Sequence, residues 1–297
     1  MPWIAYQVVL RLHSPLHIGW GRVSYLQRAR PYVTGRVLRG ALVSRVARNQ
    51  NEFGDTAGDP YRKVSKTFAQ YLTFTYFYPA LQNEAGKWEV CFPWKDEVVF
   101  RRRFLSSYVA AALSYPQQTA AEGLLYETEF LSPYTLDTGE PVYLMGYVFV
   151  DEEHLRSEKY DWPGAFRRLQ LGGERGYGWG EARLADNGIR PISSGEKLFD
   201  DIRFELGAER PRLHLDKDQP VLAHTNAEAG SLAGSIEPMV GREWRADNKN
   251  DRRHVGQHIA FNGMYFAPGS RVLRSSDFNI GEGGYWQPAS PPESAPP

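Results

Sequence analysis

The sequence has only one cysteine, Cys91, among its 297 residues. A single cysteine excludes an intrachain disulfide and any zinc site built from several cysteines. The sequence also lacks an apolar run near the roughly 18 residues that can cross a bilayer. Its N-terminus lacks the basic, then apolar, then small-residue order of a signal peptide. We therefore expect a cytoplasmic protein with no membrane partner.

Net charge is absent as well, because 35 basic and 35 acidic residues cancel. The first 50 residues nevertheless contain eight arginines, no lysine and no acidic residue. Guanidinium groups suit bidentate contact with phosphate, and here they lie inside a segment with clear hydrophobic periodicity. This arginine block therefore indicates contact with a phosphate backbone.

Several catalytic motifs are missing. The sequence contains no Walker-type phosphate loop, no HExxH zinc motif and no GxSxG nucleophile motif. Residues 17–21 superficially resemble a dinucleotide fingerprint, but Ser24 stands where its third glycine would be, and no ribose-binding acid follows. We therefore expect no nucleotide cofactor.

A few histidines have a spacing found in metal sites. His254 and His258 are four residues apart, with His224 upstream, and Asp247 or Asp251 would have to complete a zinc site. Because such spacing is common, we expect no metal and no other cofactor.

Hydrophobic periodicity predicts alternating strands and helices in the first 186 residues. The expected strands are 4–12, which is half-buried, 71–78, 124–131, 143–150 and 181–185, and the expected helices are 35–48 and about 162–171. Strands 124–131 and 143–150 are expected to pair, and 88–103 to form an exposed insertion. Without insertions, the order is strand, helix, strand, strand, helix, strand. This order predicts an α+β protein with a ferredoxin-like, RNA-recognition-type domain.

The rest of the chain is less regular. We expect a ferredoxin-like domain over 1–186, a linker over 187–198 and a β-leaning accessory lobe over 199–286. The proline-rich tail, 287–297, is expected to be disordered.

A glycine-rich segment precedes the last expected strand of the first domain. Residues 172–180 contain five glycines, interleaved with Arg175, Tyr177 and Trp179. Glycine lets backbone N–H groups approach phosphate, and the aromatic side chains offer stacking surfaces for bases. The alternative is a tight turn without a ligand. On the helix 35–48, Arg36 and Arg39 share a face near the N-terminus, where helix N–H groups favour an anion.

Three segments together resemble one family. They are residues 12–21 (LHSPLHIGWG), 31–42 (PYVTGRVLRGAL) and 171–180 (LGGERGYGWG). In order, they are similar to the sPlhiG.G, PyipGssLrGal and lGg.rsrGyGrv motifs of the RAMP superfamily of CRISPR-associated proteins. Thr34 and Arg36 depart from the second motif, where Pro and Ser are common.

The resemblance implies CRISPR RNA as the ligand, and the backbone RAMP subunits and large subunit of a type III interference complex as partners. With the charge pattern, it assigns RNA binding to His17, Gly19, Gly21, Arg22, Arg36, Arg39, Gly173, Arg175, Gly176, Tyr177, Gly178, Trp179 and Gly180.

The resemblance also bears on catalysis. Backbone subunits of type III complexes generally carry an aspartate between the first strand and first helix, whereas residues 13–35 contain no Asp or Glu. We therefore expect a non-catalytic subunit that grips guide RNA, of the kind that caps the backbone and holds the repeat-derived 5′ handle, or a related paralogue. One alternative is a metal-independent processing endoribonuclease that uses His13 or His17 as a general base. A different class, a carbohydrate-binding β-rich module, would use the exposed aromatics to stack on sugars.

Overall fold

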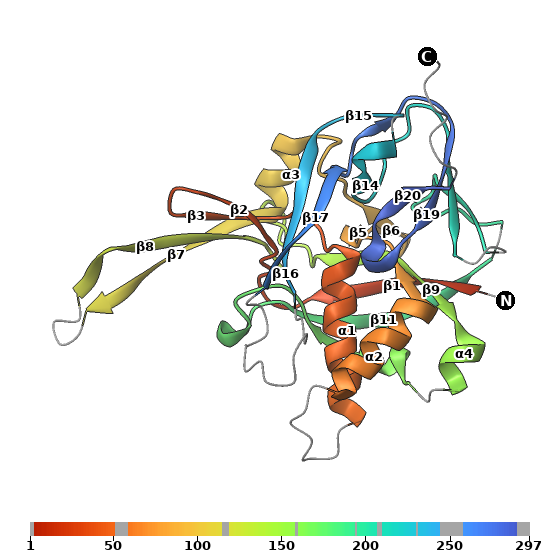
Figure 1. Ribbon diagram of the computed structural model, residues 1–297. Coiled ribbons are helices and arrows are strands. Elements are labelled where there is room, and N and C mark those ends of the chain that lie inside the picture. Colours follow the sequence, from red (N-terminus) through yellow and green to blue (C-terminus); the bar gives the residue numbers. More distant parts are fainter. Residues whose placement is uncertain are drawn as a thin grey trace.

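The computed structural model describes residues 3–50, 59–114, 119–157, 160–193, 195–206, 210–229, 231–243 and 258–289. The described chain is an α+β structure rich in strands, as predicted (Figure 1). None of the helices in these ranges is long and apolar enough to cross a membrane.

The central sheet is built around the first strand. β1 (Trp3–Leu12) lies between β11 (Glu181–Ile192) and β9 (Tyr143–Asp151) and is antiparallel to both. The sheet continues with β10 (Arg168–Gln170) beside β11, and with β4 (Leu72–Phe74), β5 (Tyr78–Gln82) and β6 (Trp88–Val90) on the side of β9. Its main order is therefore β10-β11-β1-β9-β5-β6.

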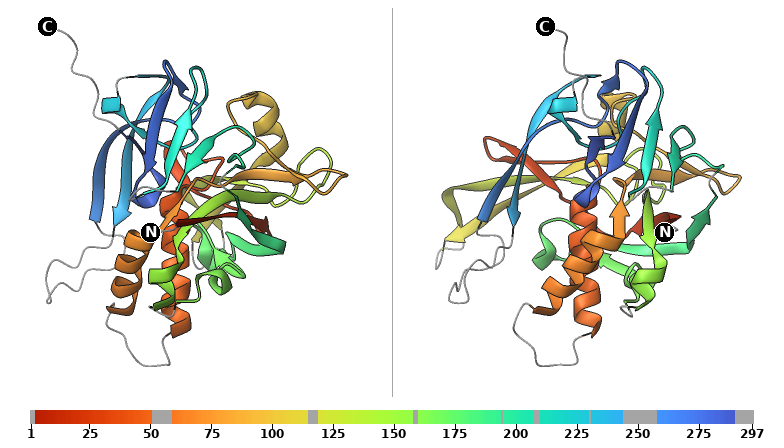
Figure 2. Two further views of the ribbon diagram at one scale, coloured as in Figure 1. Left: turned by 90° about the vertical axis from the view of Figure 1, so that its right-hand side faces the viewer. Right: turned by 45° about the vertical axis from the view of Figure 1, so that its right-hand side comes forward.

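Both faces of this sheet are covered. Val8 and Leu10 pack on the core that includes helices α1 (Gly35–Gln50), α2 (Asp59–Tyr71), α4 (Glu152–Ser157) and α5 (Trp162–Ala165). Ala5 and Val9 point the other way and pack with residues of the C-terminal strands, such as Phe278. The prediction of a half-buried strand was therefore wrong, because the C-terminal lobe covers the second face (Figure 2).

The C-terminal lobe is a second sheet. Its order is β12 (Arg203–Glu205), β13 (Arg212–Leu215), β19 (Ser276–Ile280), β20 (Trp286–Pro288), β14 (Thr225–Asn226), β17 (His258–Phe266) and β16 (Ile236–Glu243). β15 (Leu232–Ala233) and β18 (Arg271–Val272) form a separate pair, and the short 3₁₀ turns η2 (Ala227–Ala229) and η3 (Glu282–Gly284) also belong to this lobe.

A third, four-stranded sheet projects from the body as an arm (Figure 1). It consists of β2 (Gly19–Val23), β3 (Leu26–Ala29), β8 (Thr119–Leu131) and β7 (Leu105–Ser114), and α3 (Glu97–Phe104) leads into β7. Strand 124–131 therefore pairs with β7 and β3, and not with 143–150 as predicted, because 143–150 belongs to the central sheet.

Other boundaries also differ from the prediction. The run 71–78 divides into β4 and the start of β5, and the expected insertion at 88–103 contains β6 and most of α3. The helix expected over 162–171 ends at Ala165, because the chain extends again at Arg168–Gln170, which form β10 and pair with β11. β11 continues through the expected linker to Ile192, where it pairs with β1. Gln287 and Pro288, expected in the tail, belong to β20, whereas 290–297 lie outside the described residues.

Candidate functional site

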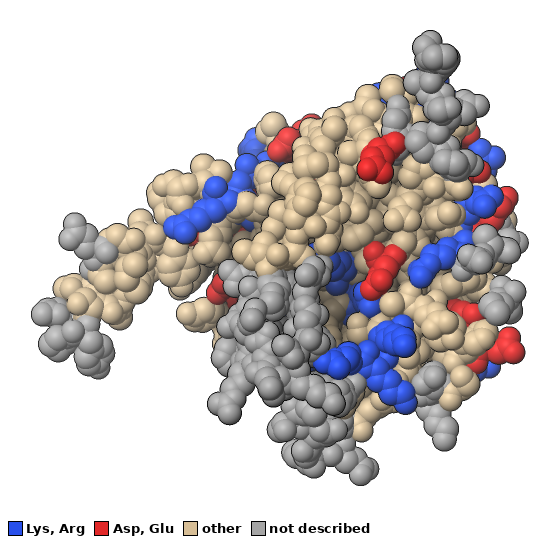
Figure 3. Space-filling view, in the orientation of Figure 1, with Lys and Arg blue, Asp and Glu red and all other residues tan. Residues whose placement is uncertain are grey.

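A basic groove of about 1320 Å³ lies where the arm, α1, α2 and the C-terminal lobe meet. Its lining residues come from the loop after β1, the start of α1, α2, the glycine-rich segment and β16. The cationic ones are Arg22, Arg30, Arg36, Arg39, Arg62, Lys66 and Arg175. Glu282 is the only acidic side chain among the described lining residues. Figure 3 shows basic side chains gathered over the face that α1 and α2 expose.

Two of the family-like segments form one hydrogen-bonded unit at the end of this groove. Gly173 N donates to the carbonyl of His17 at 2.8 Å, and Gly180 N donates to that of Pro15 at 2.8 Å. Glu181 N donates to Ser14 Oγ at 2.8 Å. The loop after β1 and the glycine-rich segment, which are far apart in the sequence, therefore hold each other in place.

The glycines of this segment have different roles. Gly172 and Gly180 have positive φ angles of 71° and 80°, and a Cβ at either position would overlap a carbonyl oxygen, that of His17 or Leu171. These two glycines are therefore required by the packing of the turn. A Cβ at Gly176 would meet no atom within 4 Å. Gly178 also has a positive φ, of 81°. The tight-turn interpretation thus explains Gly172, Gly178 and Gly180, but not Gly176.

The tip of the glycine-rich segment directs only one predicted side chain toward the groove. Arg175 lines it, and its Nε donates to the carbonyl of Gly172 at 2.9 Å. Burial, with the positive charge of Arg48 nearby, lowers the pKa of Arg175. Tyr177 is 75% exposed but lies outside the groove lining. Trp179 packs edge-on against Phe130, with ring centroids 5.1 Å apart.

The structure therefore divides the predicted RNA-binding residues into two sets. Those that line the groove are His17, Gly19, Gly21, Arg22, Arg36, Arg39, Gly173 and Arg175. Those that lie outside its lining are Gly176, Tyr177, Gly178, Trp179 and Gly180.

The start of α1 is covered by the C-terminal lobe. A Cβ at Gly35 would lie 2.7 Å from the carbonyl oxygen of Gly283, so η3 packs directly on the first helical turn. A Cβ at Gly241 would overlap the guanidinium group of Arg36, which therefore lies against β16. The sequence predicts that the face of this helix near its N-terminus favours an anion. In the structure, this face lies at the junction of two lobes.

The two candidate general bases are separated by the fold. His17 is buried, and its Nδ1–H donates to the carbonyl of Glu129 at 2.7 Å, while the residue lines the groove. His13 is exposed outside the groove lining. Its pKa is lowered by partial burial and by the charges of Arg183 and Arg11.

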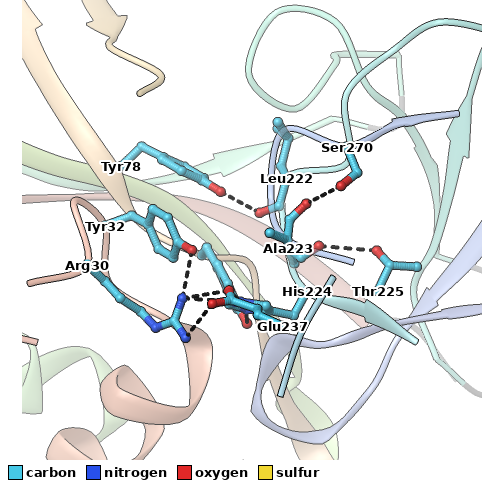
Figure 4. Close-up of polar contacts among 11 residues, drawn as sticks. Arg30, Tyr32, Tyr78, Leu222, Ala223, His224, Thr225, Glu237 and Ser270 are labelled. Carbon is cyan, nitrogen blue, oxygen red and sulfur yellow. Dashed lines mark hydrogen bonds and ion pairs between the residues drawn. The ribbon is translucent and has the colours of Figure 1, made fainter. Parts of the chain in front are cut away.

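A buried polar network joins the two lobes beside the groove (Figure 4). Arg30 donates from Nη1 and Nη2 to the two carboxylate oxygens of Glu237, at 2.8 and 3.3 Å, and from Nη1 to the hydroxyl of Tyr32 at 3.1 Å. His224 Nε2 bonds to the same carboxylate, and its Nδ1 lies 2.6 Å from the Tyr76 hydroxyl oxygen.

The pKa values of this network follow from its burial and charges. Burial opposes ionisation of Glu237, but hydrogen bonds from His224 and Arg30 outweigh it and lower the pKa to about 2. Burial lowers the pKa of His224. A neutral His224 would donate from Nε2 to the carboxylate and accept at Nδ1 the hydrogen bond from the Tyr76 hydroxyl. The network is thus a buried arginine–carboxylate pair with each partner hydrogen-bonded.

Sequence reasoning missed the contribution of α2. Tyr61, Arg62 and Lys66 line the groove, and Arg62 and Lys66 share a helix face at a spacing of four residues. This spacing was a usable signal. It was hidden because α2 begins at Asp59–Pro60, directly after a stretch rich in Gly, Asp and Asn that is typical of a loop.

The structure describes only some of the histidines and aspartates that have a metal-like spacing in the sequence. His224 is engaged in the buried network, whereas Asp247, Asp251 and His254 lie outside the described residues. Within the described ranges, no group of three His, Cys, Asp or Glu side chains could hold a metal ion.

No protein-family model matches the sequence, and no curated protein matches it. Solved structures of low similarity include a chain of the Type III-B Cmr-beta complex bound to cognate target RNA, with 12% identity, a TM-score of 0.42, and coverage of 61% of this chain and 96% of that chain. A second chain, from the complex bound to target RNA and AMPPnP, has 11% identity, a TM-score of 0.46, and coverage of 90% and 85%. A third, from the apo complex, has 10% identity, a TM-score of 0.39, and coverage of 61% and 96%.

Proposed function

We propose that this protein binds the backbone of guide RNA as a non-catalytic subunit of a type III CRISPR complex. The observation that carries the proposal is the groove itself, where seven cationic side chains face one acidic side chain among the described lining residues. Lys and Arg contacts to phosphate provide sequence-independent affinity for nucleic acid. Two segments that resemble RAMP motifs form one end of this groove. Backbone RAMP subunits and the large subunit are the proposed protein partners.

We propose a ferredoxin-like domain as the frame of this site. The antiparallel order β11-β1-β9-β5 supports this assignment, since the four strands correspond to the fourth, first, third and second of a strand-helix-strand-strand-helix-strand chain. Helices α1 and α2 connect the first pair, and α4 and α5 connect the last. The accessory lobe would then begin near residue 199 and close the groove from the opposite side.

A second candidate function is metal-independent cleavage of guide RNA. It is favoured by one observation, the placement of His17 on the groove. Since Nδ1–H donates to Glu129, the neutral imidazole carries its lone pair on Nε2 and could accept a proton there. Incubation of repeat RNA with the protein and EDTA tests this candidate. Cleavage that is lost in His17→Ala would support it.

The binding function is tested by measuring RNA affinity against salt concentration. Arg30 is already paired with Glu237, so six cations of the groove remain for RNA. If each of them neutralises one phosphate of single-stranded RNA, log K falls with log salt at a slope of roughly −4. Arg22→Glu and Arg175→Glu should each weaken binding at least about tenfold at low salt and make the slope shallower by roughly 0.7 or more. Arg203→Glu is the matched control, because Arg203 pairs with Asp216 outside the groove lining.

The same assay separates the classes of function. Unchanged affinity in both groove variants would refute the proposed binding site. A wild-type protein with no RNA affinity, whether alone or copurified with its complex, would favour the carbohydrate-binding alternative, which binding to immobilised polysaccharides would then test.

A further inference from the structure

The acidic side chain in the groove, Glu282, is held beside Arg39 by the packing of η3 on α1. It belongs to η3 of the C-terminal lobe, which packs directly on the first turn of α1 through Gly283 and Gly35. This backbone contact places the Glu282 carboxylate next to the guanidinium group of Arg39, with which it forms an ion pair. The side chain of Glu282 is 56% exposed, whereas that of Arg39 is 18% exposed.

The guanidinium group of Arg39 is bonded to α2 on one side and to Glu282 on the other. Its Nη2 donates to Ser65 of α2, to the backbone carbonyl at 2.8 Å and to Oγ at 3.0 Å. Its buried Nε–H has no acceptor within the described part of the chain. Nη1 bonds to Glu282 on the solvent side. An incoming anion would therefore meet Arg39 at the atom that Glu282 already occupies.

A carboxylate and a phosphate accept hydrogen bonds from the same guanidinium group. A pair with one largely exposed partner is weak, so its replacement by another anion costs little. A chain of phosphates in the groove would contact the surrounding cations together, whereas a single small anion would gain only one contact. The Glu282 carboxylate would also repel a phosphate that entered without displacing it.

We propose that Glu282 is an internal competitor: its carboxylate pairs with Arg39 in the free protein and is displaced by a phosphate of the RNA backbone when RNA binds. This proposal rests on the proposed function. Arg39 then contributes to RNA affinity only after this exchange. The competitor weakens binding of isolated anions and leaves the groove to ligands that carry several phosphates.

The test is a titration of the full chain with a fluorescently labelled single-stranded RNA at several salt concentrations. Glu282→Gln keeps the size and polarity of the side chain but removes its charge, and its exposure makes a folding defect unexpected. It should bind RNA about three- to tenfold tighter at low salt, and its salt slope should be steeper by roughly 0.7. Glu84→Gln removes the same charge from an exposed turn outside the groove lining, and should leave affinity unchanged.

A double-variant cycle with Arg39→Ala identifies the route of the effect. The gain from Glu282→Gln should disappear in the Arg39→Ala background. Affinity of Glu282→Gln equal to the wild type would overturn the proposal, and so would a gain that persists without Arg39, since this would indicate general repulsion. If the wild type and all variants bind no RNA, the proposed function itself fails and the competitor proposal fails with it.

Discussion

The buried pair Arg30–Glu237 offers a sharp test of how the two lobes are held together. The two side chains are only 13% and 19% exposed. A carboxyl pKa that falls from 4.5 to about 2 corresponds to roughly 3 kcal/mol of stabilisation of the folded state at neutral pH. Removing one partner of a buried pair generally costs about 3–5 kcal/mol, because the other charge stays buried. Glu237→Gln should therefore lower the free energy of unfolding by about 3 kcal/mol.

The assay is urea denaturation at pH 7, followed by tryptophan fluorescence and circular dichroism. Glu228→Gln is a control in the same lobe, because Glu228 is exposed on η2. It should change the free energy of unfolding by less than about 0.5 kcal/mol. A loss below about 1 kcal/mol in Glu237→Gln would refute the reasoning, since the buried charge of Arg30 would then need no partner.

The same pair predicts how stability depends on pH. The pKa of Glu237 is lower in the folded state, so its contribution is complete above about pH 4.5 and is lost as the pH falls toward 2. The difference in free energy of unfolding between wild type and Glu237→Gln should shrink over this range. Burial also lowers the pKa of His224 in the folded state. Below about pH 6.5, His224 is therefore protonated more readily in the unfolded chain, and the free energy of unfolding falls further as the pH decreases.

Two further substitutions test the turn of the glycine-rich segment and a buried hydrogen bond between the lobes. Gly180→Ala should destabilise the fold by about 1–3 kcal/mol in thermal unfolding, because φ is 80° and a Cβ would overlap the Leu171 carbonyl. Gly176→Ala should leave the stability unchanged, because a Cβ there meets open space. Equal losses of stability in the two variants would contradict the different roles assigned to these glycines. Tyr78→Phe should cost about 1–3 kcal/mol, because it leaves the buried carbonyl of Leu222 without the hydroxyl that donates to it at 2.7 Å. An unchanged free energy of unfolding in Tyr78→Phe would show that this bond adds nothing.

Elements with a strong local pattern could be predicted. Strand 4–12 and helix 35–48 match β1 and α1 to within two residues, because their apolar side chains recur with the period of the element they form. α2 was missed because a loop-like composition precedes it and a proline lies at its start. The partner of β8 was predicted wrongly because pairing depends on which sheet a strand joins, and periodicity within the strand does not contain this information.

The sequence by itself determined the chemical character of the site. It provides the arginine-rich N-terminal segment and the two glycine-containing motifs, residues 12–21 and 171–180. Only the tertiary structure decided which of these groups lines the groove. Arg39 pairs with Glu282, 243 positions away in the sequence, and the C-terminal lobe covers the start of α1. The physical reason is that backbone conformation follows from near neighbours, whereas the partner of a charged side chain depends on where the folded chain returns.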